Sequence, residues 1–80
     1  MTVFDPEKLL TRIQRNPGVK GGRPKVRTTR YTVDFVLDQL AQYMDINILI
    51  AEYPGLEPDD VAACLLYAAN CIVEKELGDA

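Results

Sequence analysis

The sequence contains no histidine and no tryptophan, and only two of its 80 residues are cysteines. Histidine is the commonest general base and the commonest metal ligand, so its absence excludes every Ser-His or Cys-His catalytic pair. No apolar run approaches the roughly 20 residues that a membrane-spanning helix needs. The first residues, from Met1 to Pro6, have neither the basic flank nor the apolar stretch of a secretory signal. We therefore expect a cytoplasmic protein without a histidine-based active site, with no bound metal and no small-molecule substrate.

The two cysteines, Cys64 and Cys71, are seven residues apart in a segment that we expect to form one helix. This spacing separates them by about 10 Å along the helix axis, too far for a disulfide within the helix. The simplest interpretation is that both are small buried hydrophobic residues in a reducing compartment. An intermolecular disulfide, or a metal ion shared across a symmetric dimer, remains the alternative.

Charge divides the chain into two parts with opposite sign. Residues 1–30 hold eight basic and two acidic side chains, a net charge of +6, whereas residues 31–80 hold one basic and ten acidic side chains, a net charge of −9. Hydrophobic residues make up 48% of the sequence, which is ample for one core. We expect a single domain over residues 1–80, with two surfaces that meet different partners.

The basic N-terminal segment, residues 1–32, is predicted to contain a short β-hairpin. Residues 25–33 alternate apolar with basic side chains, which favours strands near 25–27 and 31–32 with Arg27 and Arg30 facing solvent. Residues 8–15 fit one or two helical turns or a short strand, and the pattern does not separate these possibilities.

Residues 33–77 are predicted to form a three-helix unit. Apolar side chains recur at helical spacing over 33–44 and again from Ile46 to Tyr53, with Asp45 as a cap and Pro54-Gly55 as a terminator. A third helix is expected from Pro58 to about Leu77. The predicted fold class is therefore mostly α, a helix-turn-helix-like domain of the homeodomain or winged-helix kind with a short β-hairpin near the N-terminus.

The third predicted helix is apolar nearly all round between Val61 and Val73, where only Asn70 is strongly polar. Such a helix is normally buried on more than one side, and 80 residues supply too little material to surround it. We expect a homodimer or partner interface there. The predicted interface residues are Ile48, Leu65, Leu66, Tyr67, Ile72 and Val73.

Two groups of residues could carry chemistry. Asp34 and Asp38 share one helix face, and such carboxylates hold Mg²⁺ in nucleases, although solvated acidic residues are the simpler interpretation. The glycine-rich loop 18–23 lacks P-loop spacing but could touch a phosphate backbone. The acidic start of the third helix opposes its entry into a DNA groove. Contacts with nucleic acid or an acidic partner are therefore expected from Lys20, Arg23, Lys25, Arg27 and Arg30, unless these cations serve only solubility.

Several stretches in order resemble one family: Asn16-Pro17-Gly18-Val19-Lys20-Gly21-Gly22-Arg23-Pro24, Val26-Arg27-Thr28-Thr29-Arg30, Ile50-Ala51-Glu52-Tyr53-Pro54-Gly55-Leu56 and Asp60-Val61-Ala62-Ala63. They resemble the bacterial domain of unknown function 433 family, over roughly residues 12–70. The resemblance implies an antitoxin-like protein that binds and silences a PIN-like ribonuclease toxin in a toxin–antitoxin system. It also implies that a dimer could bind DNA as an autorepressor, and that the protein is not an enzyme and has no cofactor. The alternative is a structural protein–protein interaction or adaptor domain without nucleic-acid binding.

Overall fold

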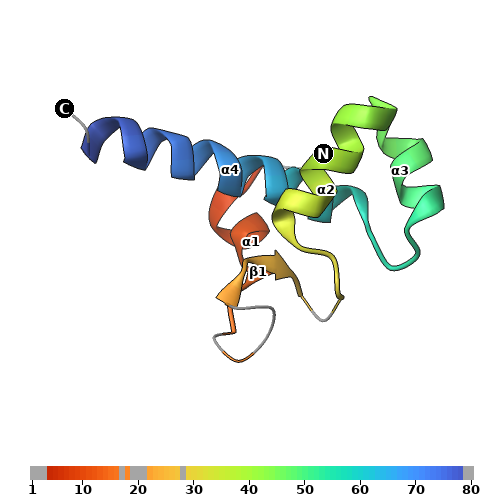
Figure 1. Ribbon diagram of the computed structural model, residues 1–80, viewed down its shortest axis with the longest axis horizontal. Coiled ribbons are helices and arrows are strands. Elements are labelled where there is room, and N and C mark those ends of the chain that lie inside the picture. Colours follow the sequence, from red (N-terminus) through yellow and green to blue (C-terminus); the bar gives the residue numbers. More distant parts are fainter. Residues whose placement is uncertain (1–3, 17, 19–21, 28, 79–80) are drawn as a thin grey trace.

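The computed structural model describes residues 4–16, 18, 22–27 and 29–78. Within these ranges the chain forms four helices and one two-stranded sheet (Figure 1). The elements in order are α1 (Pro6–Leu10), β1 (Ile13–Gln14), β2 (Lys25–Val26), α2 (Val33–Tyr43), α3 (Ile46–Glu52) and α4 (Pro58–Gly78). The mostly helical fold with a short hairpin near the N-terminus is confirmed, and the region between residues 8 and 15 contains both a helical turn and a strand.

The helix ends follow from local side-chain chemistry. At the start of α3, the Asp45 carboxylate accepts hydrogen bonds from the backbone N–H groups of Asn47 and Ile48, at 2.9 and 3.2 Å. Just before it, Met44 ends α2 in the left-handed conformation with φ of 52°. The two helices therefore turn sharply within two residues. Thr32 occupies the N-cap position of α2, but its side chain makes no capping hydrogen bond.

The sheet pairs different segments from those predicted. Strand β1 is antiparallel to β2, with Ile13 opposite Val26 and Gln14 opposite Lys25. The predicted pairing of 25–27 with 31–32 survives as one isolated bridge between Lys25 and Thr32. That side of the ladder is short because α2 begins at Val33, whose N–H already bonds to the carbonyl of Pro24 at 2.9 Å.

The core lies where α2, α3 and the first turns of α4 meet β2. Its buried apolar side chains come from each of these elements and from the loop before α4: Val26, Val33, Val36, Leu49, Leu56, Val61 and Cys64. Val26 is 0% exposed because the sheet lies directly against the helices. The second half of α4 extends past this core, away from α2 and α3 (Figure 1). No described helix has the length and apolar character needed to cross a membrane.

We predict that Leu49→Ala lowers the free energy of unfolding by about 2–4 kcal/mol, because it leaves a cavity at a fully buried position. Its neighbour in sequence, Ile48, is 46% exposed and serves as a matched control. Ile48→Ala is expected to change the unfolding free energy by less than about 1 kcal/mol. Chemical denaturation followed by circular dichroism measures both, and equal losses would contradict the packing described for α3.

Candidate functional site

Two arginines from the sheet meet two acidic residues at the start of α4, and we call these four residues the charge cluster: Arg12, Arg27, Glu57 and Asp60. Arg12 directly precedes β1 and Arg27 directly follows β2, so they continue the antiparallel register as an opposed pair. The Arg27 N–H bonds to the Arg12 carbonyl at 2.8 Å. Two like charges held opposite each other repel, so the arrangement requires a carboxylate between them.

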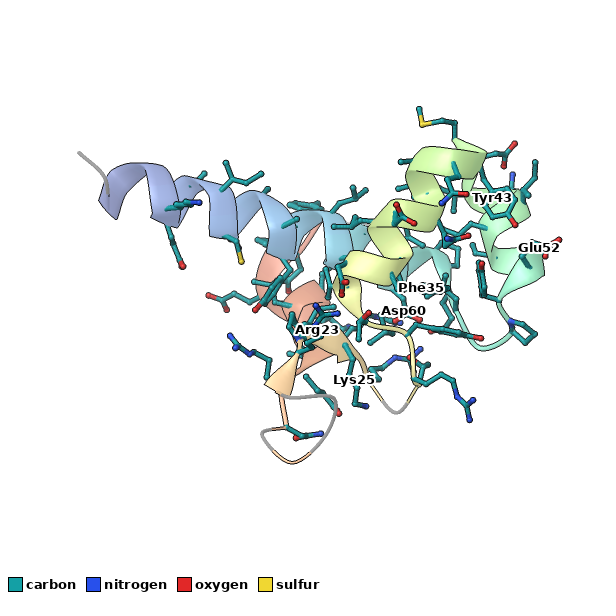
Figure 2. The ribbon with its side chains drawn as sticks, viewed as in Figure 1. Arg23, Lys25, Phe35, Tyr43, Glu52 and Asp60 are labelled. Carbon is teal, nitrogen blue, oxygen red and sulfur yellow. The ribbon has the colours of Figure 1, made fainter. Side chains whose placement is uncertain are left out.

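Asp60 supplies that carboxylate, and its side chain is 0% exposed. Arg27 grips it as a fork, with Nε 3.2 Å from Oδ1 and Nη2 2.8 Å from Oδ2, while Arg12 Nη1 lies 3.0 Å from Oδ1. The Glu57 side chain, half exposed, lies 2.7 Å from Arg12 and 3.2 Å from Arg27. Figure 2 places Asp60 in the middle of the view, close to both sheet and helices.

Asp60 also caps its own helix. It is the third residue of α4, and its Oδ2 accepts the backbone N–H of Glu57 at 2.9 Å, as the acidic residue of a capping box does. Burial by itself raises the pKa of Asp60, but the hydrogen bonds from Arg27, from the Glu57 backbone and from Arg12 outweigh it. The pKa of Asp60 therefore lies below its ordinary value of 3.8.

The predicted contact residues are largely occupied within the fold. The Lys25 side chain is buried, at 8% exposure, and its ammonium donates to the carbonyls of Arg27 and Thr29. Arg27, expected to face solvent, instead folds back onto α4 because Asp60 attracts it, and its backbone adopts a strained φ of 34°. Arg23 lies 3.3 Å from Asp34. Arg30 is exposed, and Lys20 lies outside the described residues.

This pairing changes the meaning of the charge division. The cations of the N-terminal segment and the acids at the start of α4 were expected to form separate surfaces, yet Arg12 and Arg27 neutralise Glu57 and Asp60 inside one molecule. Sequence reasoning did not single out Arg12, and it treated the acidic start of the third helix as a charge that opposes entry into a DNA groove, not as a partner for arginine. One signal in the sequence could have suggested the contact. Asp60 stands three positions after the cap residue Glu57, and the N-terminal segment holds more arginines than acidic residues to pair with them.

Three aromatic rings pack together, and two of them, Tyr31 and Tyr53, also pack against the core. Tyr31 stacks on Phe35 with centroids 6.1 Å apart, and Tyr53 meets both rings edge-on at 5.6 and 5.2 Å. The Tyr31 hydroxyl donates to the Pro54 carbonyl, and the Tyr53 hydroxyl donates to the side-chain oxygen of Gln39. Burial raises the pKa of Tyr53, and the nearby Tyr43 and Glu52 raise it further. The cluster ties the start of α2 to the turn between α3 and α4.

The predicted interface residues fall on two separate surfaces. Leu65, Ile72 and Val73 are 47%, 58% and 53% exposed on α4, with Leu66 and Tyr67 partly covered and Tyr67 packed against the core. Ile48 lies on α3, at the far end of the longest axis from the second half of α4 (Figure 1). It is preceded in sequence by other exposed apolar residues, Tyr43, Met44 and Ile46.

The two cysteines and the two acidic residues of α2 are the other side chains that were considered for chemistry. Cys64 is buried, and burial raises the pKa of its thiol to about 12, so it remains a protonated hydrophobic residue. Cys71 was also predicted to be buried but is exposed, because α4 has left the core at that point. Asp34 pairs with Arg23, and Asp38 accepts a hydrogen bond from Gln42 at 2.9 Å. The described residues include no group of three or more acidic, cysteine or histidine side chains placed to hold a metal ion.

Comparison with known families agrees with the order of motifs along the chain. The family model described as "Protein of unknown function (DUF433)" matches residues 13–68, which is more than two thirds of the sequence. The chain belongs to this family. The match to the domain of unknown function 433 family begins at β1 and ends within α4, so it includes Arg27, Glu57 and Asp60. Comparison with curated proteins and with solved structures gave no match.

The charge cluster predicts an acid-sensitive fold. A carboxylate whose pKa is lowered in the folded state stabilises the protein above its unfolded pKa of about 4, and this stabilisation is lost as the pH falls through the folded value. We expect Asp60→Asn to cost about 1–3 kcal/mol of unfolding free energy at pH 7 and to flatten the pH dependence below about pH 4. Denaturant melts from pH 7 to pH 2.5 test this, and parallel curves for the two proteins would contradict it.

Arg27 and Arg30, which both follow β2, should differ in how much they contribute to the stability of the fold. Arg27→Met removes the fork on a buried carboxylate, so we expect a clearly lower melting temperature than in the wild type. Arg30→Met is the matched control, because Arg30 is exposed, and its melting temperature should stay within about 2 °C of the wild type. Differential scanning calorimetry measures both. An equal effect of the two substitutions would remove the charge cluster as a stabilising feature.

Proposed function

We propose that this family member is a non-enzymatic, antitoxin-like module that binds a basic protein, a PIN-like ribonuclease, through an acidic and apolar surface. We call it the α2–α3 surface: its apolar part is Tyr43, Met44, Ile46 and Ile48, and its acidic part is Asp45 and Glu52. The observation that carries the proposal is the exposure of four large apolar side chains around one tight turn. Met44 alone is 79% exposed and Ile48 is 46% exposed.

The carboxylates of this surface suit a cationic partner. Glu52 lies one helical turn after Ile48 on α3, and Figure 2 shows Tyr43 and Glu52 at the same end of the molecule. After residue 30 the only cation in the chain is Lys75, which lies near the other end, on α4. An apolar patch with acidic neighbours and no adjacent cation attracts a positively charged surface and repels a nucleic acid.

A ribonuclease presents such a surface, because it must hold the phosphates of RNA with basic side chains. An acidic protein that covers these side chains competes directly with RNA, which is the simplest way to silence the enzyme. The apolar residues at the centre of the α2–α3 surface would supply the desolvated contacts from which most binding energy comes. Methionine adapts well to such contacts because its side chain is flexible.

DNA binding through the N-terminal segment is the competing function, and the geometry favours it less. Arg12 and Arg27 pair with Asp60, Arg23 pairs with Asp34, and Lys25 is buried. Each of these contacts would have to break, or share its cation, before a phosphate could take its place. Among the five predicted contact residues, Arg30 is the described one best placed to meet a phosphate, since it is exposed.

The test is a titration of the chain against a PIN-like ribonuclease encoded beside its gene, by calorimetry and by inhibition of RNA cleavage. We expect Ile48→Lys and Glu52→Lys each to weaken both binding and inhibition by at least about tenfold. Arg30→Glu is the control and should leave both unchanged. The same proteins are titrated against DNA from upstream of the gene by fluorescence anisotropy.

Three results would overturn the proposal. One is the absence of any ribonuclease gene beside this one, and another is unchanged inhibition by Ile48→Lys and Glu52→Lys. The third is tight, salt-sensitive DNA binding that Arg30→Glu abolishes, with no ribonuclease binding, which would establish the competing function instead.

A further inference from the structure

The outward face of α4 carries an apolar seam, which we define as Leu65, Leu66, Ala69, Ile72 and Val73. Leu65, Ala69 and Ile72 follow each other at intervals of four and three residues, the spacing by which one helix packs along another. Leu65, Ile72 and Val73 are about half exposed. Nothing in the described chain covers them, because this part of the 21-residue helix α4 extends past the core (Figure 1). The seam faces away from the buried residues of the same helix, which are Asp60, Val61, Ala63 and Cys64.

The surface area of the whole chain indicates how much of it lacks a covering. A compact monomer of 9.0 kDa exposes about 4,850 Å², from the scaling of area with mass. This chain exposes 5724 Å². The excess is about 870 Å², of the order of the roughly 800 Å² that each protein contributes to a standard interface, and the part of α4 that extends past the core contributes to it (Figure 1). The radius of gyration, 13.1 Å, also exceeds the value of about 11.6 Å expected for 80 residues.

We infer that a second copy of this chain covers the seam, with the two α4 helices antiparallel and crossing at Ala69. The seam is symmetric about that residue: Leu65 and Val73 lie four positions to either side, and Leu66 and Ile72 lie three positions to either side. An antiparallel crossing at Ala69 therefore places Leu65 against the partner's Val73 and Leu66 against the partner's Ile72. Each large side chain meets another large side chain, and the small residue sits where the axes approach most closely.

A second copy fits this seam better than a charged partner does. Residues 61–73 contain no charged side chain, so the seam offers a basic or acidic protein no electrostatic advantage and does not repel itself. The antiparallel orientation is favoured over the parallel one for two reasons. It places the positive end of each helix dipole beside the negative end of the other, and it keeps Glu74 away from the partner's Glu74.

The dimer is independent of the proposed ribonuclease binding. The seam and the α2–α3 surface lie at opposite ends of the longest axis (Figure 1), so association through α4 leaves both α2–α3 surfaces accessible. Each inference can fail without the other, because one is measured by mass and cross-linking and the other by inhibition of RNA cleavage.

The experiment uses the full chain with Cys71→Ser and Ala69→Cys, so that the only exposed thiol among the described residues lies at the crossing point. Light scattering should give twice the chain mass of 9.0 kDa. Mild oxidation should join two Ala69→Cys chains rapidly and nearly completely, because residues on a two-fold axis lie within disulfide distance. The wild-type Cys71, on the other side of the helix, is the matched control and should cross-link at least about tenfold more slowly.

A second variant separates association from cross-linking chemistry. Leu65→Glu changes an exposed side chain, so the fold should persist by circular dichroism while the molecular mass falls to that of a single chain. A monomeric wild type at about 0.1 mM would overturn the inference. So would a dimer in which Cys71 cross-links faster than Ala69→Cys, or one that Leu65→Glu leaves intact.

Discussion

The fold depends on one buried carboxylate that joins the two oppositely charged parts of the chain. Asp60 caps the helix to which it belongs and holds both arginines that flank the small sheet. A two-stranded sheet with two paired residues on each strand is not stable by itself. Its place against the helices follows from this contact and from the burial of Val26 beside it. The core and the charge cluster therefore stabilise each other, since the first two turns of α4 supply Asp60, Val61 and Cys64.

The sequence predicted the helices well and the ion pairs poorly, for physical reasons. Helix spans depend on local spacing and caps, so the ranges 33–44 and 58–77 are close to the observed α2 and α4. The sheet was assigned the wrong main partner because pairing between residues 13–14 and 25–26 depends on tertiary contacts that periodicity does not report. Arg27 was placed on the surface because basic and apolar residues alternate along residues 25–33, and Lys25 was predicted to contact a partner. Which carboxylate lies near them in space is information that only the folded chain contains.

The exposed apolar residues lie at two ends of the molecule, and the two ends differ in charge. The seam on α4 is neutral and symmetric about Ala69, whereas the α2–α3 surface is apolar with acidic neighbours. The sequence suggested one interface that included both Ile48 and Val73, because both residues are apolar and stand in helices. The distance between α3 and the end of α4 divides that set into a surface suited to self-association and one suited to a basic protein.

The contacts of Asp60 also bear on the order in which the chain becomes structured during synthesis. Its partners Arg27 and Arg12 precede it by 33 and 48 residues. Both arginines therefore leave the ribosome well before the carboxylate that balances them, and they emerge beside ribosomal RNA, which attracts free cations. The sheet gains its stabilising contact only when the first turn of α4 has appeared. The N-terminal segment of the domain therefore becomes ordered only after the first turn of α4 has been made.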